Sequence, residues 1–150
     1  MNLGGLLLNR VLAAGLIAWG IGQSIKLPLE YARTRRWNWA LLISAGGMPS
    51  SHSALVISTA LAIGLFYGFD NPLFALAIAV CMVVTYDATN IRRQAGIHAQ
   101  KINLLVNEMF SGQPISEEQL KEVLGHTPLE VAGGVVLGVA VAILTWFFWR

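Results

Sequence analysis

The stretch GGMPSSHS at residues 46–53, followed directly by an apolar run over 54–69, decides how the fold of this chain is interpreted. Two glycines permit a tight turn, Pro49 fits the first turn of a helix, and serine side chains cap exposed amides there. The stretch therefore predicts a helix N-terminus, whose unpaired N–H groups and partial positive charge favour a bound anion. His52 adds a side chain that exchanges protons near neutral pH, which suits phosphate chemistry. An ordinary capped loop with a hydrogen-bonded histidine explains the same residues, so both interpretations stay open.

The composition is typical of a membrane protein. Of the 150 residues, 55% are hydrophobic and 12% are charged, and the mean hydropathy of +0.61 is high for a soluble domain. We expect one integral membrane domain over residues 1–150. The net charge of +2 is modest and the basic residues are clustered, which argues against nucleic-acid binding. The single cysteine, Cys81, lies in an apolar run and has no partner for an intrachain disulfide or a metal site.

Four apolar stretches predict an all-α, polytopic bundle with about four transmembrane helices. The predicted spans cover residues 6–25, 54–69, 72–86 and 131–149. The middle two are shorter than the about 20 residues that a full span requires, so we expect them to extend into their polar flanks. The tight-turn sequence Asp70-Asn71-Pro72 makes these two spans an antiparallel hairpin.

Residues 91–124 mix polar and apolar side chains, and their apolar positions recur at helical spacing. The sequence SEEQ at 116–119 is a capping-box pattern that would open a second short helix after a turn at 111–114. We expect one or two amphipathic helices lying at the membrane interface. A solvated connector without chemistry of its own is the alternative.

Alternating spans bring the polar motifs to one face of the membrane. There the loop over 26–45 meets His52, the end of the third span and the start of the fourth. All ten Lys and Arg residues except Arg10 and Arg150 fall on that face, so the positive-inside tendency predicts a cytoplasmic face of a bacterial inner membrane. Cations retained to bind phosphate would carry less information about orientation.

The segment LGHTPLE at 124–130 carries a second candidate group. Residues four apart share a helical face, so Glu130 would hold one nitrogen of His126 and leave the other to attack or to transfer a proton. The pattern Thr127-x-x-Glu130 is also a capping box, with Pro128 at the first helical position. Capping alone would account for Glu130, and both explanations remain open.

A third candidate group consists of Lys26 and Arg33, with Arg35 and Arg36 just beyond. A lysine point charge and an arginine fork together clasp the oxygens of a phosphate. Juxtamembrane cations also anchor lipid head groups, and this alternative is open for each of them.

Together these motifs resemble the three-part signature of the type 2 phosphatidic acid phosphatase superfamily, which includes lipid phosphatases, bacterial acid phosphatases and vanadium-dependent haloperoxidases. The signature is carried by Lys26-x6-Arg33, Pro49-Ser50-Ser51-His52 and His126-x3-Glu130. The chain is more closely similar to the divergent branch of small membrane proteins in that superfamily. This likeness extends over nearly the whole chain and rests on GGMPSSHS at 46–53, YDA at 86–88, RRQAG at 92–96 and LGHTPLEV at 124–131.

The resemblance implies a role for each matching residue. His126 would be the nucleophile that forms a phosphohistidine, Glu130 its orienting partner, and His52 the acid that protonates the leaving oxygen. The phosphoryl oxygens would be held by Lys26, Arg33, Ser50 and the amides near Ser51. Oriented positive charge stabilises the transition state, so the implied chemistry needs no metal or cofactor.

The chain departs from the superfamily pattern at three positions. Ser51 stands where glycine is usual, and Glu130 stands where aspartate is usual. The arginine about six residues before the nucleophile would fall at Leu120, which cannot bind phosphate. We expect Arg92 or Arg93 to supply that charge, with Asp87 positioning it through a salt bridge.

The implied substrate is a lipid phosphate monoester or diphosphate. A cytoplasmic site favours a synthesis intermediate such as phosphatidylglycerol phosphate, an outward site favours a polyprenyl diphosphate, and phosphatidic acid is a further option. Four short spans make a small bundle, so we expect a homo-oligomer embedded in membrane lipids. A halide-oxidising enzyme with bound vanadate and a non-catalytic lipid-phosphate-binding or scaffold protein are the alternatives.

Overall fold

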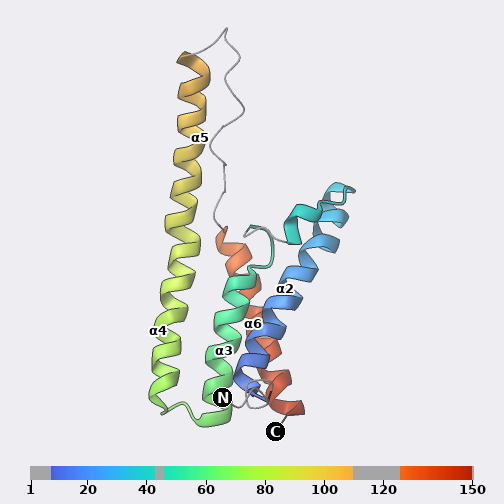
Figure 1. The fold of residues 1–150 in the computed structure, drawn as a ribbon, viewed down its shortest axis with the longest axis vertical. Coiled ribbons are helices and arrows are strands. Elements are labelled where there is room, and N and C mark those ends of the chain that lie inside the picture. Colours follow the sequence, from blue (N-terminus) through green and yellow to red (C-terminus); the bar gives the residue numbers. More distant parts are fainter. Residues whose placement is uncertain (1–7, 43–45, 110–125, 150) are drawn as a thin grey trace.

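The computed structural model describes residues 8–42, 46–109 and 126–149, and within these ranges every regular element is helical. The chain order is shown in Figure 1. The elements are α2 (Arg10–Thr34), the short 3-10 helix η1 (Trp39–Leu42), α3 (Ser51–Tyr67), α4 (Pro72–Tyr86), the π-helical turn η2 (Asp87–Ile91), α5 (Arg92–Met109) and α6 (Pro128–Phe148). The expected all-α fold is confirmed.

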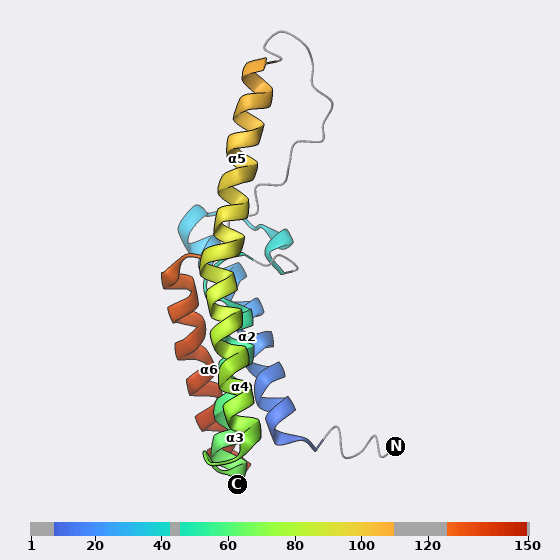
Figure 2. The same ribbon diagram turned by 90° about the vertical axis from the view of Figure 1, so that its left-hand side faces the viewer.

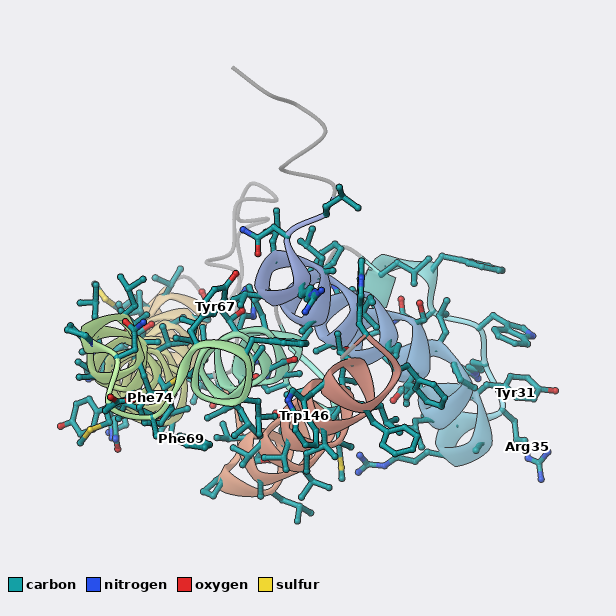
Figure 3. All side chains as sticks on the ribbon, turned by 90° about the horizontal axis from the view of Figure 1, so that it is seen from below. Tyr31, Arg35, Tyr67, Phe69, Phe74 and Trp146 are labelled. Atoms are coloured by element: carbon teal, nitrogen blue, oxygen red, sulfur yellow. The ribbon has the colours of Figure 1, made fainter. Side chains whose placement is uncertain are left out.

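Helix α3 is the centre of the bundle. It packs most extensively against α6 and α2, and α4 contacts it on another side. Seen along the bundle in Figure 3, α3 lies between α4 and the pair formed by α2 and α6. Helices α3 and α6 begin at the same end of the bundle, whereas α2 runs in the opposite direction (Figure 1). This arrangement brings the first turns of α3 and α6 together.

Small residues rather than large side chains set the contacts between these helices. A Cβ atom added at Gly134 of α6 would collide with the Ser50 carbonyl oxygen, and one at Gly138 would lie 2.7 Å from the Ala54 carbonyl oxygen. On α2, a Cβ at Gly22 would lie 3.2 Å from the Cα atom of Ser51. Close backbone approach at small residues is a common way for membrane helices to associate.

Three helical stretches are long and apolar enough to cross a membrane: Arg10–Thr34, Pro72–Val106 and Pro128–Phe148. The predicted spans at 72–86 and 131–149 coincide closely with α4 and α6, and the one at 54–69 with α3. Helix α3 has 17 residues and is a shorter apolar helix. The structure therefore supports three spanning candidates, and the expected number of four is not confirmed.

The predicted loop over 26–45 is wrong in its first part. Helix α2 continues through Pro28 as far as Thr34, and Arg35 ends it in the left-handed region with φ 57°. The Arg35 N–H donates to the carbonyl oxygen of Tyr31 at 2.8 Å. The fall in hydropathy after residue 25 did not end the helix, so Lys26 and Arg33 both lie on α2.

Residues 91–109 of the predicted interfacial segment are helical, in η2 and α5, and their position at a membrane interface stays a prediction. Helix α5 continues α4 through η2 and extends beyond the rest of the bundle (Figures 1 and 2). It does not turn to lie across the end of the bundle. The second predicted helix, the pattern at 116–119 and Leu120 fall outside the described residues.

Candidate active site

The first turn of α6 is held by the predicted capping box. The Thr127 hydroxyl accepts a hydrogen bond from the Glu130 N–H at 3.3 Å, and the Thr127 N–H donates to Glu130 Oε2 at 3.0 Å. Pro128 occupies the first helical position, where its missing N–H costs little. The capping explanation of Glu130 is confirmed.

The same carboxylate oxygen also contacts His126. Nδ1 of His126 lies 3.1 Å from Glu130 Oε2. An ionised carboxylate only accepts hydrogen bonds, so Nδ1 is the donor in this contact, and in the neutral imidazole the lone pair is then on Nε2. The His126 side chain is 4% exposed, and its buried Nε2 has no hydrogen-bond partner among the described residues. A fixed imidazole with an unsatisfied lone pair is suited to nucleophilic attack.

His52 lies in the first turn of α3, two residues after the N-cap. Ser50 is the N-cap, and its hydroxyl accepts from the Ser53 N–H at 3.3 Å and from the Ser53 hydroxyl at 3.0 Å. The Ser50 N–H donates to the Glu130 carbonyl oxygen at 2.9 Å, which ties the starts of α3 and α6 together. The rings of His52 and His126 are 6.4 Å apart between centroids. One small group can therefore contact both imidazoles.

A cavity of about 230 Å³ opens between these two histidines and the end of α4. Its lining combines titratable side chains with apolar walls and consists of His52, Val83, Val84, Asp87, Ala88 and His126. Asp87 is the first residue of the π-helical turn η2. Such turns insert an extra residue into a helix and are frequent at functional sites. We call this space the histidine cavity.

A second cavity, of about 330 Å³, lies on the other side of Glu130. We call it the cation cavity; its lining residues are Lys26, Leu29, Glu30, Arg33, Leu41, Gly47, Met48 and Glu130. Lys26 and Arg33 are about two helical turns apart on α2 and so share a face. Lys26 is only 2% exposed, and its ammonium group interacts electrostatically with the Glu130 carboxylate.

The structure thus divides the predicted site residues between two cavities. Both histidines and Asp87 line the histidine cavity, and Lys26 and Arg33 line the cation cavity with Glu130. Ser50 and Ser51 are buried at the start of α3, and the Ser51 hydroxyl has no hydrogen-bond partner among the described residues. Arg92 and Arg93 open α5, but their side chains are outside the described part, so their role stays a prediction.

Sequence reasoning missed some residues that shape the site. Glu30 adds a second carboxylate to the cation cavity, and Gly134 lets α6 approach the backbone of Ser50. Glu30 stands four residues after Lys26 and Gly134 four after Glu130, so helical spacing was the available signal. The described residues contain no cluster of three or more His, Cys, Asp or Glu side chains that could hold a metal ion.

Comparison with known proteins finds a matching family and a related membrane protein. The model of a family described as "Divergent PAP2 family" matches residues 7–141. The uncharacterized membrane protein YuiD of Bacillus subtilis (strain 168) is 38% identical over 155 residues, covering 95% of this chain and 98% of the relative. No solved structure matches the chain. With its apolar helices, this relationship makes the chain a membrane protein.

Proposed function

The chain belongs to the divergent PAP2 family, and from this premise we propose that it is a membrane-embedded lipid phosphatase. The proposed reaction is hydrolysis of a phosphate monoester or diphosphate of a lipid through a phosphohistidine. The observation that carries the proposal is the His126 imidazole. Its Nδ1 is held by Glu130, its buried Nε2 has no partner among the described residues, and its ring lines a cavity shared with His52.

In the first step, the lone pair of His126 Nε2 attacks phosphorus, and the bond between phosphorus and the lipid oxygen breaks. The leaving oxygen takes a proton from His52, so that the lipid departs as an alcohol or as a shorter phosphate. Glu130 stabilises the positive charge that develops on the His126 ring through the 3.1 Å contact to Nδ1. The geometry of one carboxylate behind one histidine supports this assignment.

In the second step, water attacks the phosphohistidine. Neutral His52 takes a proton from that water as its oxygen bonds to phosphorus, and the bond from phosphorus to Nε2 breaks. Inorganic phosphate leaves and both histidines return to their starting states. Splitting one difficult hydrolysis into two steps lowers the barrier that each has to cross.

The oxygens of the transferred group require positive partners. Ser50 and the amides near Ser51, at the start of α3, are proposed to bind them, as are the side chains of Arg92 and Arg93. Lys26 and Arg33 are proposed to act from the cation cavity, where Lys26 interacts electrostatically with the Glu130 carboxylate. The enzyme is proposed to work at the cytoplasmic face of a bacterial inner membrane, as a homo-oligomer.

A second function is favoured by one observation. Lys26 and Arg33 share their cavity with two carboxylates rather than with both histidines. A protein that holds a lipid phosphate at these cations without cleaving it would need no histidine pair. Non-catalytic lipid-phosphate binding or scaffolding is therefore the alternative proposal.

The test is phosphate release by the purified protein in lipid nanodiscs. The substrates are phosphatidylglycerol phosphate, phosphatidic acid and a polyprenyl diphosphate, each with and without a metal chelator. We expect His126→Gln and His52→Gln to lower turnover by about 10²–10⁴-fold, because each removes a group that acts in both steps. The exposed third histidine gives the matched control, His98→Gln, which is expected to keep full turnover.

A covalent trap separates the two proposals further. With ³²P-labelled substrate, acid-labile label is expected on the wild type and on His98→Gln but not on His126→Gln. Turnover unaffected by both active-site substitutions would overturn the histidine mechanism. Saturable binding that depends on Lys26 and Arg33, without turnover of any of the three lipids, would establish the alternative.

A further inference from the structure

The position of His52 conflicts with the role of an acid. His52 is the second residue of α3, a helix of 17 residues, and stands at the end where the helix dipole places partial positive charge. A protonated imidazole is disfavoured at such a helix end, yet an acid has to hold its proton until the leaving oxygen takes it. A negative group near His52 would resolve this conflict.

Among the side chains that the structure describes, the elements packed around the start of α3 bring six titratable or charged groups to the two cavities there. They are Lys26, Glu30 and Arg33 from α2, His126 and Glu130 from the start of α6, and Asp87 from η2. Lys26 and Arg33 are positive, and His126 is the proposed nucleophile. Glu30 and Glu130 line the cation cavity. Glu130 directs its Oε2 to His126 Nδ1 and the Thr127 N–H. Asp87 is the carboxylate that lines the histidine cavity together with His52.

The local structure explains why a carboxylate reaches this place. Helices α4 and α5 are joined by the π-helical turn η2, which lies beside the start of α3. Asp87 is the first residue of that turn. Val83, Val84 and Ala88 give the cavity apolar walls beside it. Apolar walls lower the local dielectric constant, so a charge across a small cavity acts more strongly than at the surface.

We propose that Asp87 is a positioning residue whose carboxylate keeps His52 protonated, so that each of the two histidines has its own carboxylate. This inference rests on the proposed function and assigns Asp87 a role different from the expected salt bridge to Arg92 or Arg93. His52 gives its proton to the leaving oxygen and becomes neutral, while Asp87 stays ionised. The ring then regains a proton from the attacking water, and Asp87 stabilises the charge that returns.

The test reads the protonation state of His52 directly. The chain has three histidines, so the imidazole ¹⁵N signals of labelled protein in nanodiscs are assigned by single His→Gln substitutions. In Asp87→Asn we expect the ratio of protonated to neutral His52 at pH 7 to fall about tenfold or more, since loss of a nearby opposite charge shifts a titration by a unit or more. The signals of His98 are expected to stay unchanged, and those of His126 are expected to change less than those of His52, because Glu130 still contacts its Nδ1.

Two further variants sharpen the result. Asp87→Glu keeps the charge and is expected to restore most of the protonated His52. Asp70→Asn removes an exposed carboxylate from the turn between α3 and α4 and is expected to change none of the three histidines. An unchanged His52 titration in Asp87→Asn would overturn the inference.

Turnover measurements on the same proteins keep this inference apart from the proposed function. For an active enzyme, Asp87→Asn is expected to move the upper pH limit of turnover to lower pH and to lower kcat more than it raises KM. If no lipid phosphate is hydrolysed but His52 protonation still depends on Asp87, the phosphatase proposal fails and the charge pairing stands. If turnover depends on both histidines but His52 is indifferent to Asp87, the pairing fails alone.

Discussion

One oxygen of Glu130 serves two donors. Glu130 Oε2 accepts from the Thr127 N–H at 3.0 Å and lies 3.1 Å from His126 Nδ1, so helix capping and histidine orientation use the same atom. The two explanations of Glu130 are therefore compatible. Because the capping box fixes the carboxylate, it also fixes the ring that the carboxylate contacts.

Substitutions can separate these two uses. We expect Glu130→Gln to keep much of the cap, since an amide oxygen still accepts one N–H, but to lower turnover by about 10²–10⁴-fold because the charge behind His126 is lost. Thr127→Ala removes the hydroxyl that accepts from the Glu130 N–H and is expected to cost about 1 kcal/mol of stability. Its turnover should stay close to that of the wild type.

Phosphate release and unfolding in mixed detergent micelles measure the two effects on the same preparations. Full turnover in Glu130→Gln combined with loss in Thr127→Ala would mean that the cap alone matters. In that case His126 would need another orienting group.

At the residue scale, the sequence spacing of two residues predicts their contact where helix geometry alone brings them together. His126 and Glu130 are neighbours because they stand four apart at a helix start, and this pairing was readable from the chain. The division of the site into the histidine cavity and the cation cavity could not be predicted from the sequence, because it depends on the side of Glu130 on which helix α2 packs. Arg33 and Lys26 were correctly grouped with each other, but their cavity excludes the histidines.

Among the elements, α6 and α3 pack so closely that little room is left for an added side chain between them. A side chain at Gly134 would collide with the Ser50 carbonyl oxygen and come within 2.9 Å of the Ser53 Cβ atom. The collision lies directly beneath the cap that precedes His52. Packing and site geometry are therefore coupled at this glycine.

Alanine substitutions measure that coupling. We expect Gly134→Ala to destabilise the protein by about 1–3 kcal/mol, because backbone atoms rather than a flexible side chain block the new methyl group. Gly20→Ala is the matched control on α2, since its Cβ would meet no atom within 4 Å, and it should be neutral or stabilising by up to about 1 kcal/mol. Thermal unfolding in detergent gives both values. Equal effects of the two substitutions would contradict close packing at Gly134.

Elements with clear start signals were predicted well. Ser50, Asn71 and Thr127 are N-caps, and the apolar runs behind them became α3, α4 and α6. The end of α2 and the course of α5 were missed, because a fall in hydropathy marks the edge of an apolar environment and does not stop a helix. The π-helical turn η2 has no signature in its sequence that separates it from an ordinary helix.

For the whole molecule, the site and the α3–α4 turn lie at opposite ends of the bundle (Figure 1). Phe69 and Phe74 beside that turn meet edge to face with centroids 5.1 Å apart. A chain that crosses a membrane in this arrangement has its site on one side and the turn on the other. The orientation of the protein therefore has two possibilities, with the site either on the cytoplasmic side of the membrane or on the outer side.

Cysteine labelling decides that choice. In a Cys81→Ala background, we expect Asp70→Cys to react with a membrane-impermeant maleimide in intact bacterial cells, and Asn38→Cys to react only after permeabilisation. Both positions are exposed in the structure, and the background itself has no other cysteine. The reverse pattern would move the site to the outer face and favour a polyprenyl diphosphate carrier as substrate.

The shortness of α3 has a consequence for how the protein is made. With 17 residues and buried serines along it, this helix is poorly suited to insertion on its own, although it becomes the centre of the bundle. Its tight turn to the more apolar α4 lets both segments leave the translocation machinery as one helical hairpin. Helix α6 then has to find α3 already in the bilayer, so the end of the bundle that carries both histidines is completed only after α6 has been made.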